Sequence, residues 1–203
     1  EGSTYGQAAN EPTVSGNDGK GSVTYTYAAK GSTEYSDKVP INAGDYTVKA
    51  TIAETDNYLG GEATADFTIA KAEQQIDAKD VTATYGDTGV KVEAKVIEPA
   101  TGGGALSYAV KEGNDVVDIN AATGELTIKK AGTAKVTVTA SETDNYKQAT
   151  KDVSVTINKK AITPTVSIEG STYGQAANEP TVSGNEGKGA VTYTYAAKGS
   201  TEY

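Results

Sequence analysis

The chain has 203 residues and a formal net charge of −9, and it contains no Cys, Met, Trp or His. Without His and Cys, the sequence excludes Ser-His-Asp and Cys-His catalysis, the usual zinc sites and disulfides. The basic residues are all Lys and are interspersed with acidic ones, so we expect no nucleic-acid partner. No run approaches the roughly 20 apolar residues of a membrane span, so we expect no membrane insertion in this segment.

Apolar residues alternate at period two along most of the chain, which is typical of half-buried strands. Turn segments separate these runs at 15–19, 101–104, 112–115 and 122–125, and no segment predicts a long helix. About seven short strands in about 85 residues predict an all-β fold of tandem Ig-like antiparallel β-sandwich modules in an elongated array. In chain order, the residues that share a face of each predicted strand are Val23, Tyr25 and Tyr27; Tyr46, Val48, Ala50 and Ile52; Ala65, Phe67 and Ile69; Val92, Ala94 and Val96; Leu106, Tyr108 and Val110; Ala134, Val136, Val138 and Ala140; and Val153, Val155 and Ile157.

The sequence repeats on two scales. Residues 1–35 return at 169–203, an offset of 168, and differ only where Glu186 replaces Asp18 and Ala190 replaces Ser22. Within that period, residues 43–58 are related to 131–146 at an offset of 88, and both stretches end in Glu-Thr-Asp-Asn-Tyr. The chain therefore consists of two related modules in alternation, as expected of an array of repeats.

We place the module boundaries near Ala72 and Lys160. Module A covers 1–72 and lacks its first strand, module B covers 73–160, and 161–203 is the N-terminal half of a second module A. Because domains near 40 residues rarely persist alone, we expect 161–203 to be ordered only by pairing with strands from another chain or from residues beyond this sequence. The connections at both boundaries are short and free of Gly, so they should restrict hinge motion.

Two stretches carry a resemblance to known families. The run from Val117 to Val138, with Ala-Thr-Gly-Glu and Ala-Gly-Thr, resembles bacterial Ig-like domains of group 2. Module A, with Asn42-Ala43-Gly44-Asp45-Tyr46 and Thr4-Tyr5-Gly6, is similar to the MBG-type modules repeated along bacterial surface adhesins. The resemblance implies β-sandwich modules of a bacterial cell-surface protein, with no shared catalytic residues and no common ligand.

Tyr46 is the candidate structural residue. Its spacing from Asn42 matches the tyrosine corner of Ig-like folds, in which a Tyr hydroxyl bonds to the backbone upstream. The alternative is a half-buried strand aromatic with its hydroxyl in water. Module B has Ala134 at the matching position, so its corner must be held in another way.

The repeated Glu-Thr-Asp-Asn-Tyr is the best candidate for a binding site. Glu54 and Asp56, with Glu142 and Asp144, place oxygen ligands in a loop near a module end, where calcium stiffens many extracellular arrays. The alternative reading is a turn capped by Asp and Asn, with the Tyr packed over the end of the core. Asp118 and Asn120 also begin like a calcium loop, but Lys129 stands where the bidentate Glu belongs, so we reject that motif.

Other signals favour structural roles. Tyr25 and Tyr27 either pack in the core or form a sugar-stacking platform. Lys–Asn isopeptide bonds are a further alternative, but the sequence does not single out a pair of residues for one. We expect no cofactor, with calcium as the one candidate ion. We expect no enzyme, because an 85-residue sandwich leaves little room for the two carboxylates of a glycosidase cleft.

The main functional hypothesis is a stalk or spacer region of a bacterial cell-surface or secreted protein that projects a distal domain, with the cell-wall anchor outside this segment. Its partners would be the neighbouring repeats of the same chain. One alternative is adhesive repeats that bind host glycan, mucin or a surface protein through many weak contacts. Another is a set of accessory modules in a large extracellular enzyme.

Overall fold

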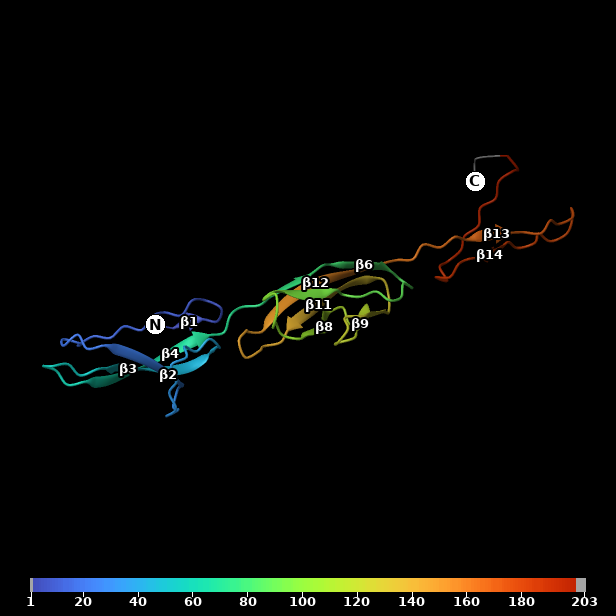
Figure 1. Cartoon of the computed structure of the whole chain (residues 1–203). Coiled ribbons are helices and arrows are strands. Elements are labelled where there is room, and N and C mark those ends of the chain that lie inside the picture. Colours follow the sequence, from blue (N-terminus) through green and yellow to red (C-terminus); the bar gives the residue numbers. More distant parts are fainter. Residues whose placement is uncertain (1, 200–203) are drawn as a thin grey trace. The chain divides into compact units, whose positions relative to one another are not determined.

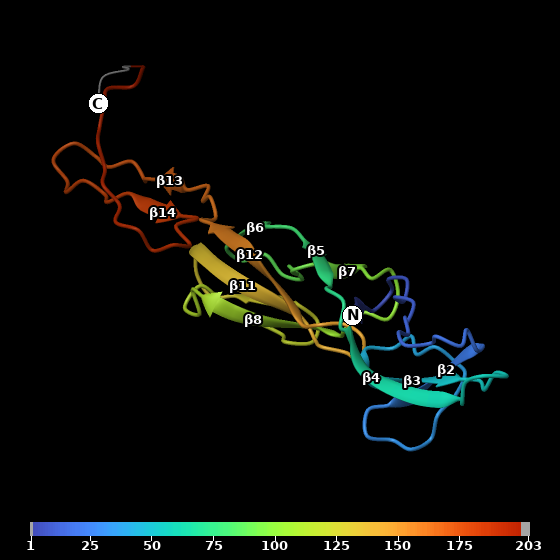
Figure 2. The ribbon, with the colours of Figure 1, turned by 90° about the vertical axis from the view of Figure 1, so that its left-hand side faces the viewer.

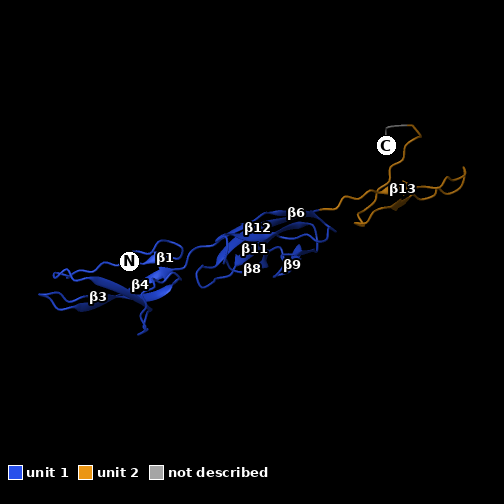
Figure 3. Cartoon of the chain, in the orientation of Figure 1, with its two compact units in different colours: residues 1–158 blue, residues 159–203 orange. Residues whose placement is uncertain are grey.

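The computed structural model describes residues 2–199, and every regular element among them is a β-strand. Contacts divide the chain into two compact units, Glu1–Asn158 and Lys159–Tyr203 (Figure 3). The first unit spans modules A and B, and the second begins at Lys159. No helix in the described part of the chain is long and apolar enough to cross a membrane.

Module A is built on one four-stranded sheet in the order β1-β4-β3-β2 (Figure 1). The β1 strand runs parallel to β4, whereas β3 is antiparallel to both of its neighbours. The strands are β1 (Ser3–Thr4), β2 (Val23–Ala29), β3 (Gly44–Ile52) and β4 (Gly61–Ala70).

The register of module A confirms the predicted faces. Tyr46 lies opposite Phe67, and Val48 lies between Tyr27 and Ala65, so the alternating apolar residues of three strands share one side of the sheet. The ring centroids of Tyr46 and Phe67 are 5.6 Å apart and stacked. The opposite side carries Thr and charged residues, as expected for a solvated face.

Module B has two layers. A four-stranded sheet in the order β6-β12-β11-β8 packs against the antiparallel pair β5-β7 (Figure 2). Strands β9 and β10 form a separate antiparallel pair. The strands are β5 (Gln75–Ala78), β6 (Val81–Thr84), β7 (Ala94–Glu98), β8 (Leu106–Glu112), β9 (Val117–Ile119), β10 (Leu126–Ile128), β11 (Gly132–Ala140) and β12 (Ala149–Asn158).

The core of module B is built largely from valine. Val136 and Val138 on β11 are fully buried, and Val136 lies opposite the buried Val153 of β12. This arrangement is the one that period-two alternation on a central strand predicts. All the buried apolar residues that form one continuous cluster in the described chain belong to module B.

The predicted strand around Val92 needs a correction. The β7 strand begins at Ala94, and Val92 precedes it, although its side chain is fully buried. The Val92 N–H donates to the carbonyl of Gly124 at 2.9 Å, so the backbone bonds to the β9–β10 turn instead of continuing a ladder. A side chain at Gly124 (φ +74°) would meet the Val92 carbonyl oxygen at 2.6 Å, which explains the glycine.

The second unit contains one short antiparallel pair, β13 (Thr165–Ser167) with β14 (Thr181–Ser183). Residues 191–197 have the same sequence as β2 yet form no strand, and no described segment of this unit pairs with them as β3 pairs with β2. Conversely, residues 13–15 match β14 but form no strand, and no described segment of module A pairs with them as β13 pairs with β14. The expectation that 161–203 needs outside strands to be ordered stays a prediction; residues 200–203 lie outside the described residues.

Candidate functional site: the joint between modules A and B

The Glu-Thr-Asp-Asn-Tyr segment of module B lies in the loop between β11 and β12. The Thr143 N–H donates to the Tyr146 carbonyl at 3.0 Å, and the Tyr146 N–H donates to Thr143 Oγ1 at 3.1 Å. Thr143, rather than Asp or Asn, therefore closes the turn. This closure leaves the side chains of Asn145 and Tyr146 free to point outside their own module.

Asn145 bonds to module A. Its side-chain oxygen accepts a hydrogen bond from the Ala43 N–H at 2.8 Å, and its amide nitrogen donates to Asn42 Oδ1 at 3.2 Å. Its backbone carbonyl accepts from the Ala72 N–H at 2.9 Å, and the Lys147 N–H returns a bond to the Ala72 carbonyl at 2.9 Å. The loop thus pairs with the connecting segment as a short parallel strand would.

Tyr46 holds the surface that receives Asn145. Its hydroxyl donates to the backbone carbonyl of Asn42 at 3.0 Å, which is the geometry of a tyrosine corner. Because Asn42 and Ala43 precede the first residue of β3, this bond fixes the two groups that contact Asn145. In module B, the corresponding corner is held instead by the Val116 carbonyl, which accepts from the Lys129 N–H at 2.8 Å.

An ion pair and an aromatic pair complete the joint. The Lys71 ammonium contacts the Glu142 carboxylate and donates to the Thr143 carbonyl at 2.7 Å. The rings of Tyr5 and Tyr146 meet edge to face with centroids 5.3 Å apart, an arrangement that stabilises aromatic pairs beyond the area they bury. The Tyr146 ring therefore packs on the neighbouring module, whereas the turn reading placed it over the end of its own core.

Gln74 ties the start of β5 to the same loop. It is 6% exposed, and its amide nitrogen donates to the carbonyls of Ser141 and Lys147 at 2.9 and 2.6 Å. Its amide oxygen accepts from the Gly104 N–H at 2.7 Å. A buried amide with both ends satisfied gives the connection a defined conformation.

The acidic candidates divide between two loops. Glu142 is paired with Lys71 at the joint, and Asp144 is exposed beside it; Glu54 and Asp56 are exposed in the loop between β3 and β4. No group of three or more acidic side chains that could hold a metal ion lies together among residues 2–199. The role of these four residues in calcium binding stays a prediction.

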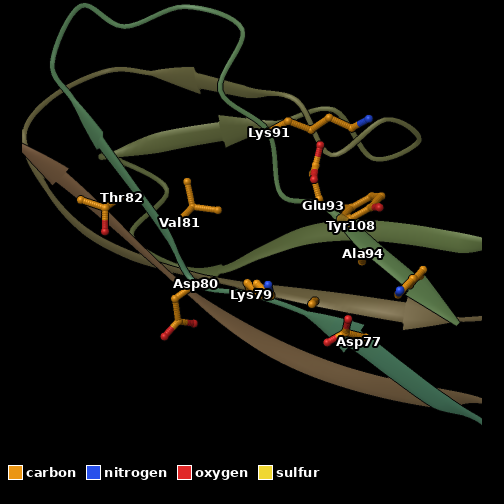
Figure 4. Close-up of a pocket in the computed structure, with 11 residues that line it drawn as sticks. Asp77, Lys79, Asp80, Val81, Thr82, Lys91, Glu93, Ala94 and Tyr108 are labelled. Carbon is orange, nitrogen blue, oxygen red and sulfur yellow. The ribbon is translucent and has the colours of Figure 1, made fainter. Parts of the chain in front are cut away.

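Module B has a groove at the crossing from β5 to β6 (Figure 4). It has a volume of about 720 Å³ and lies where the chain leaves β5 and enters β6 in the other sheet. Its rim carries three acidic and three basic residues, and Tyr108 at its base is only 8% exposed. The groove therefore offers hydrogen-bonding groups but no exposed aromatic ring for a sugar to stack on. The charged rim residues are Asp77, Lys79, Asp80, Lys91, Glu93 and Lys95.

Exposed ion pairs line the outer faces of both main sheets. The Lys111 ammonium and the Thr137 hydroxyl bond to the Asp152 carboxylate and hold its pKa below the ordinary value. Thr47 and Lys30 lower the pKa of Asp66 in the same way in module A. Thr137 lies directly opposite Asp152, and Thr47 lies directly opposite Asp66, on neighbouring strands, whereas Lys111 reaches Asp152 across β11. These outward-facing Thr therefore serve as cross-strand partners of carboxylates.

Residues 2–73 match the family model described as the MBG domain. Module A is an MBG domain. This match agrees with the resemblance drawn from Asn42–Tyr46 and Thr4–Gly6. The matched family is one of cell-surface protein repeats and is not an enzyme family. Module B lies outside the match and has the two layers of a β-sandwich. A comparison with curated protein sequences gives no significant match.

Solved structures with a similar arrangement include mouse cadherin-23 EC22-24, at 16% identity and a TM-score of 0.36, covering 70% of this chain and 56% of that one. The C-terminal 282-residue fragment of intimin, in complex with the intimin-binding domain of the translocated intimin receptor, matches at 21% identity and a TM-score of 0.30. The match covers 70% of this chain and 53% of that one. A SusE-like surface located polysaccharide binding protein of Bacteroides thetaiotaomicron matches at 18% identity and a TM-score of 0.31, covering 66% of this chain and 29% of that one. The chain spans about half the length of the first structures it matches, and these TM-scores are too low to assign a ligand.

The sequence reading did not identify the receiving side of the joint. The partners at the joint are far apart in sequence, so no local pattern connects them. The separations are 103 residues for Asn42 and Asn145, 71 for Lys71 and Glu142, and 141 for Tyr5 and Tyr146. A signal was present, since Thr-Tyr-Gly and the Ala-Gly at the start of the central strand recur in module B together with the Glu-Thr-Asp-Asn-Tyr loop. Recurrence of both halves in every module is what a contact between modules requires.

Proposed function

We propose that these modules form a stalk or spacer region of a bacterial cell-surface or secreted protein and project a distal domain from the cell. The observation that carries the proposal is the joint, where hydrogen bonds, an ion pair and an aromatic pair connect the MBG domain to module B. Modules linked only by a flexible segment would need none of these contacts. Membership of module A in a family of surface-protein repeats supports an extracellular location.

The joint favours a spacer because its bonds oppose rotation of one module against the other. At the boundary between the two modules, the Ala72 N–H and carbonyl both bond to the Asn145–Lys147 segment. Each such bond contributes about 0.5–1.5 kcal/mol net to the docked arrangement. A distal domain carried on modules with fixed relative orientations stays farther from the cell than one carried on a random coil.

Small-angle X-ray scattering tests the proposal on chains that carry one, two and three copies of residues 1–168 followed by 169–203. For ordered joints, the maximum dimension rises in proportion to the number of repeats. For freely jointed modules, it rises with the square root of that number. Square-root growth would refute the spacer role.

The adhesive alternative rests on the groove between β5 and β6, whose carboxylates and ammonium groups suit sugar hydroxyls. A glycan array probed with the 203-residue chain tests it directly. A saturable signal that Glu93→Gln reduces would favour adhesion, because that carboxylate lines the groove. A spacer gives no saturable signal in this assay.

A further inference from the structure

We propose that the Glu54–Tyr58 loop of the MBG domain is a second docking element, and that its partner is the β6 end of module B in another repeat. The same joint would then form at both kinds of module boundary. This inference goes beyond the spacer role, because an adhesive array would need the same boundary contacts.

The loop of module A is built like the loop that docks in module B. The Thr55 N–H donates to the Tyr58 carbonyl at 2.9 Å, just as the Thr143 N–H donates to the Tyr146 carbonyl. The two loops have the same five residues at an offset of 88. Their environments differ: Asn145 and Tyr146 are half-buried against module A, whereas Asn57 is exposed and Tyr58 is 54% exposed.

Module B carries the same receiving surface as module A. Both receiving tyrosines follow a short strand that is parallel to the last strand of the module, with Thr4 opposite Ala70 and Thr84 opposite Asn158. The Tyr5 N–H donates to the Ala70 carbonyl at 2.8 Å, and the Tyr85 N–H donates to the Asn158 carbonyl at 2.9 Å. Tyr85 is 48% exposed, with its ring available to a partner.

The neighbouring groups also correspond. Gly44 pairs with Ile69 and Gly132 pairs with Ile157, so Ala131 occupies the place of Ala43 before the central strand. In sequence, Lys159 follows the last strand of module B as Lys71 follows that of module A. These equivalences assign the contacts: Asn57 to the Ala131 N–H, Glu54 to Lys159, and the Tyr58 ring to Tyr85.

One contact has no counterpart. Lys130 stands where Asn42 stands in module A, and its ammonium is already paired with Asp115. The bond between the Asn amide nitrogen and the Asn42 side chain is therefore absent from the proposed joint. The joint that follows module B should accordingly be weaker than the one that follows module A.

Amide hydrogen exchange measured by mass spectrometry tests the proposal on a chain of two repeats, residues 1–168 followed by 1–203. Thr64→Ser in the second repeat, on the outer face of β4, gives its loop peptide a distinct mass. We expect amides 55–59 of the second repeat, which follows a module B, to exchange roughly tenfold more slowly than those of the first repeat, which does not. Residues 143–147 of the first repeat serve as the docked reference.

Two variants make the test specific. Lys159→Glu in the first repeat should abolish the added protection of the second loop, and Glu54→Lys in the second repeat should restore it by reversing the ion pair. Tyr85→Ala in the first repeat should also abolish it while exchange in β11 and β12 stays unchanged. Equal exchange of the two Glu54–Tyr58 loops in the parent two-repeat chain would overturn the proposal, whereas growth of the maximum dimension in proportion to the number of repeats would still support the spacer role.

Discussion

Replacement of Asn145 by Ala should loosen the joint without unfolding either module. The substitution removes two inter-module hydrogen bonds, one from the Ala43 N–H at 2.8 Å and one to Asn42 Oδ1 at 3.2 Å. At about 0.5–1.5 kcal/mol for each bond, the docked state loses about 1–3 kcal/mol relative to the undocked state. That loss corresponds to a roughly 5- to 150-fold larger population of the open joint.

Amide hydrogen exchange followed by NMR measures this change at the joint itself. The N–H groups of Ala43, Ala72 and Lys147 all bond across the boundary, so each should exchange faster in Asn145→Ala by a factor in that range. Amides in the middle of β11 and β12 should keep their rates, because the core of module B does not involve Asn145.

Asn57→Ala is the matched control, because it changes the same residue type in the same loop sequence where the side chain is exposed. It should leave the three reporter amides unchanged. If Asn145→Ala and Asn57→Ala gave the same exchange rates at Ala43, Ala72 and Lys147, the role assigned to Asn145 would be wrong.

Three further predictions follow from single contacts. Tyr46→Phe removes the bond to the Asn42 carbonyl and should lower the free energy of unfolding of module A, measured by urea titration, by about 0.5–1.5 kcal/mol. The Ala43 amide should also exchange faster, and an unchanged urea midpoint would contradict the tyrosine corner. Val136→Ala leaves a cavity at a fully buried position and should cost module B about 2–4 kcal/mol, whereas Val191→Ala, at a 44% exposed position, should change the urea midpoint little. Because bonding lowers the pKa of Asp152 in the folded state, its contribution to stability is present above the ordinary carboxyl pKa and is lost as pH falls through the lowered value. The difference in thermal midpoint between the parent chain and Asp152→Asn should therefore shrink between pH 5 and pH 2, and a constant difference would exclude that linkage.

The strands could be predicted because their signal is local. Tyr46, Val48 and Ala50 alternate with Thr and Lys along β3, and the sheet buries the face that alternation selects. Val92 shows where this reasoning fails: its burial was predicted, but its backbone bonds to Gly124, 32 residues away, and no local pattern contains that information.

The candidate site was predicted only in part. The repeated Glu-Thr-Asp-Asn-Tyr identified the correct loops. Because calcium prefers carboxylate oxygens, however, the prediction selected Glu142 and Asp144 within the loop of module B. In the structure Glu142 pairs with Lys71, and the inter-module bonds come from Asn145, which a composition-based search for acidic ligands passes over. The contact depends on which module lies next in space, and only the tertiary structure supplies that.

Residues 23–29 and 191–197 are the same seven amino acids, a strand in the first case and irregular in the second. In module A, β2 is an edge strand whose partner among the described strands is β3, and β3 begins 15 residues after β2 ends. A module A that is synthesised N-terminus first therefore gains no β2 ladder until β3 has followed, so the two strands form as one unit.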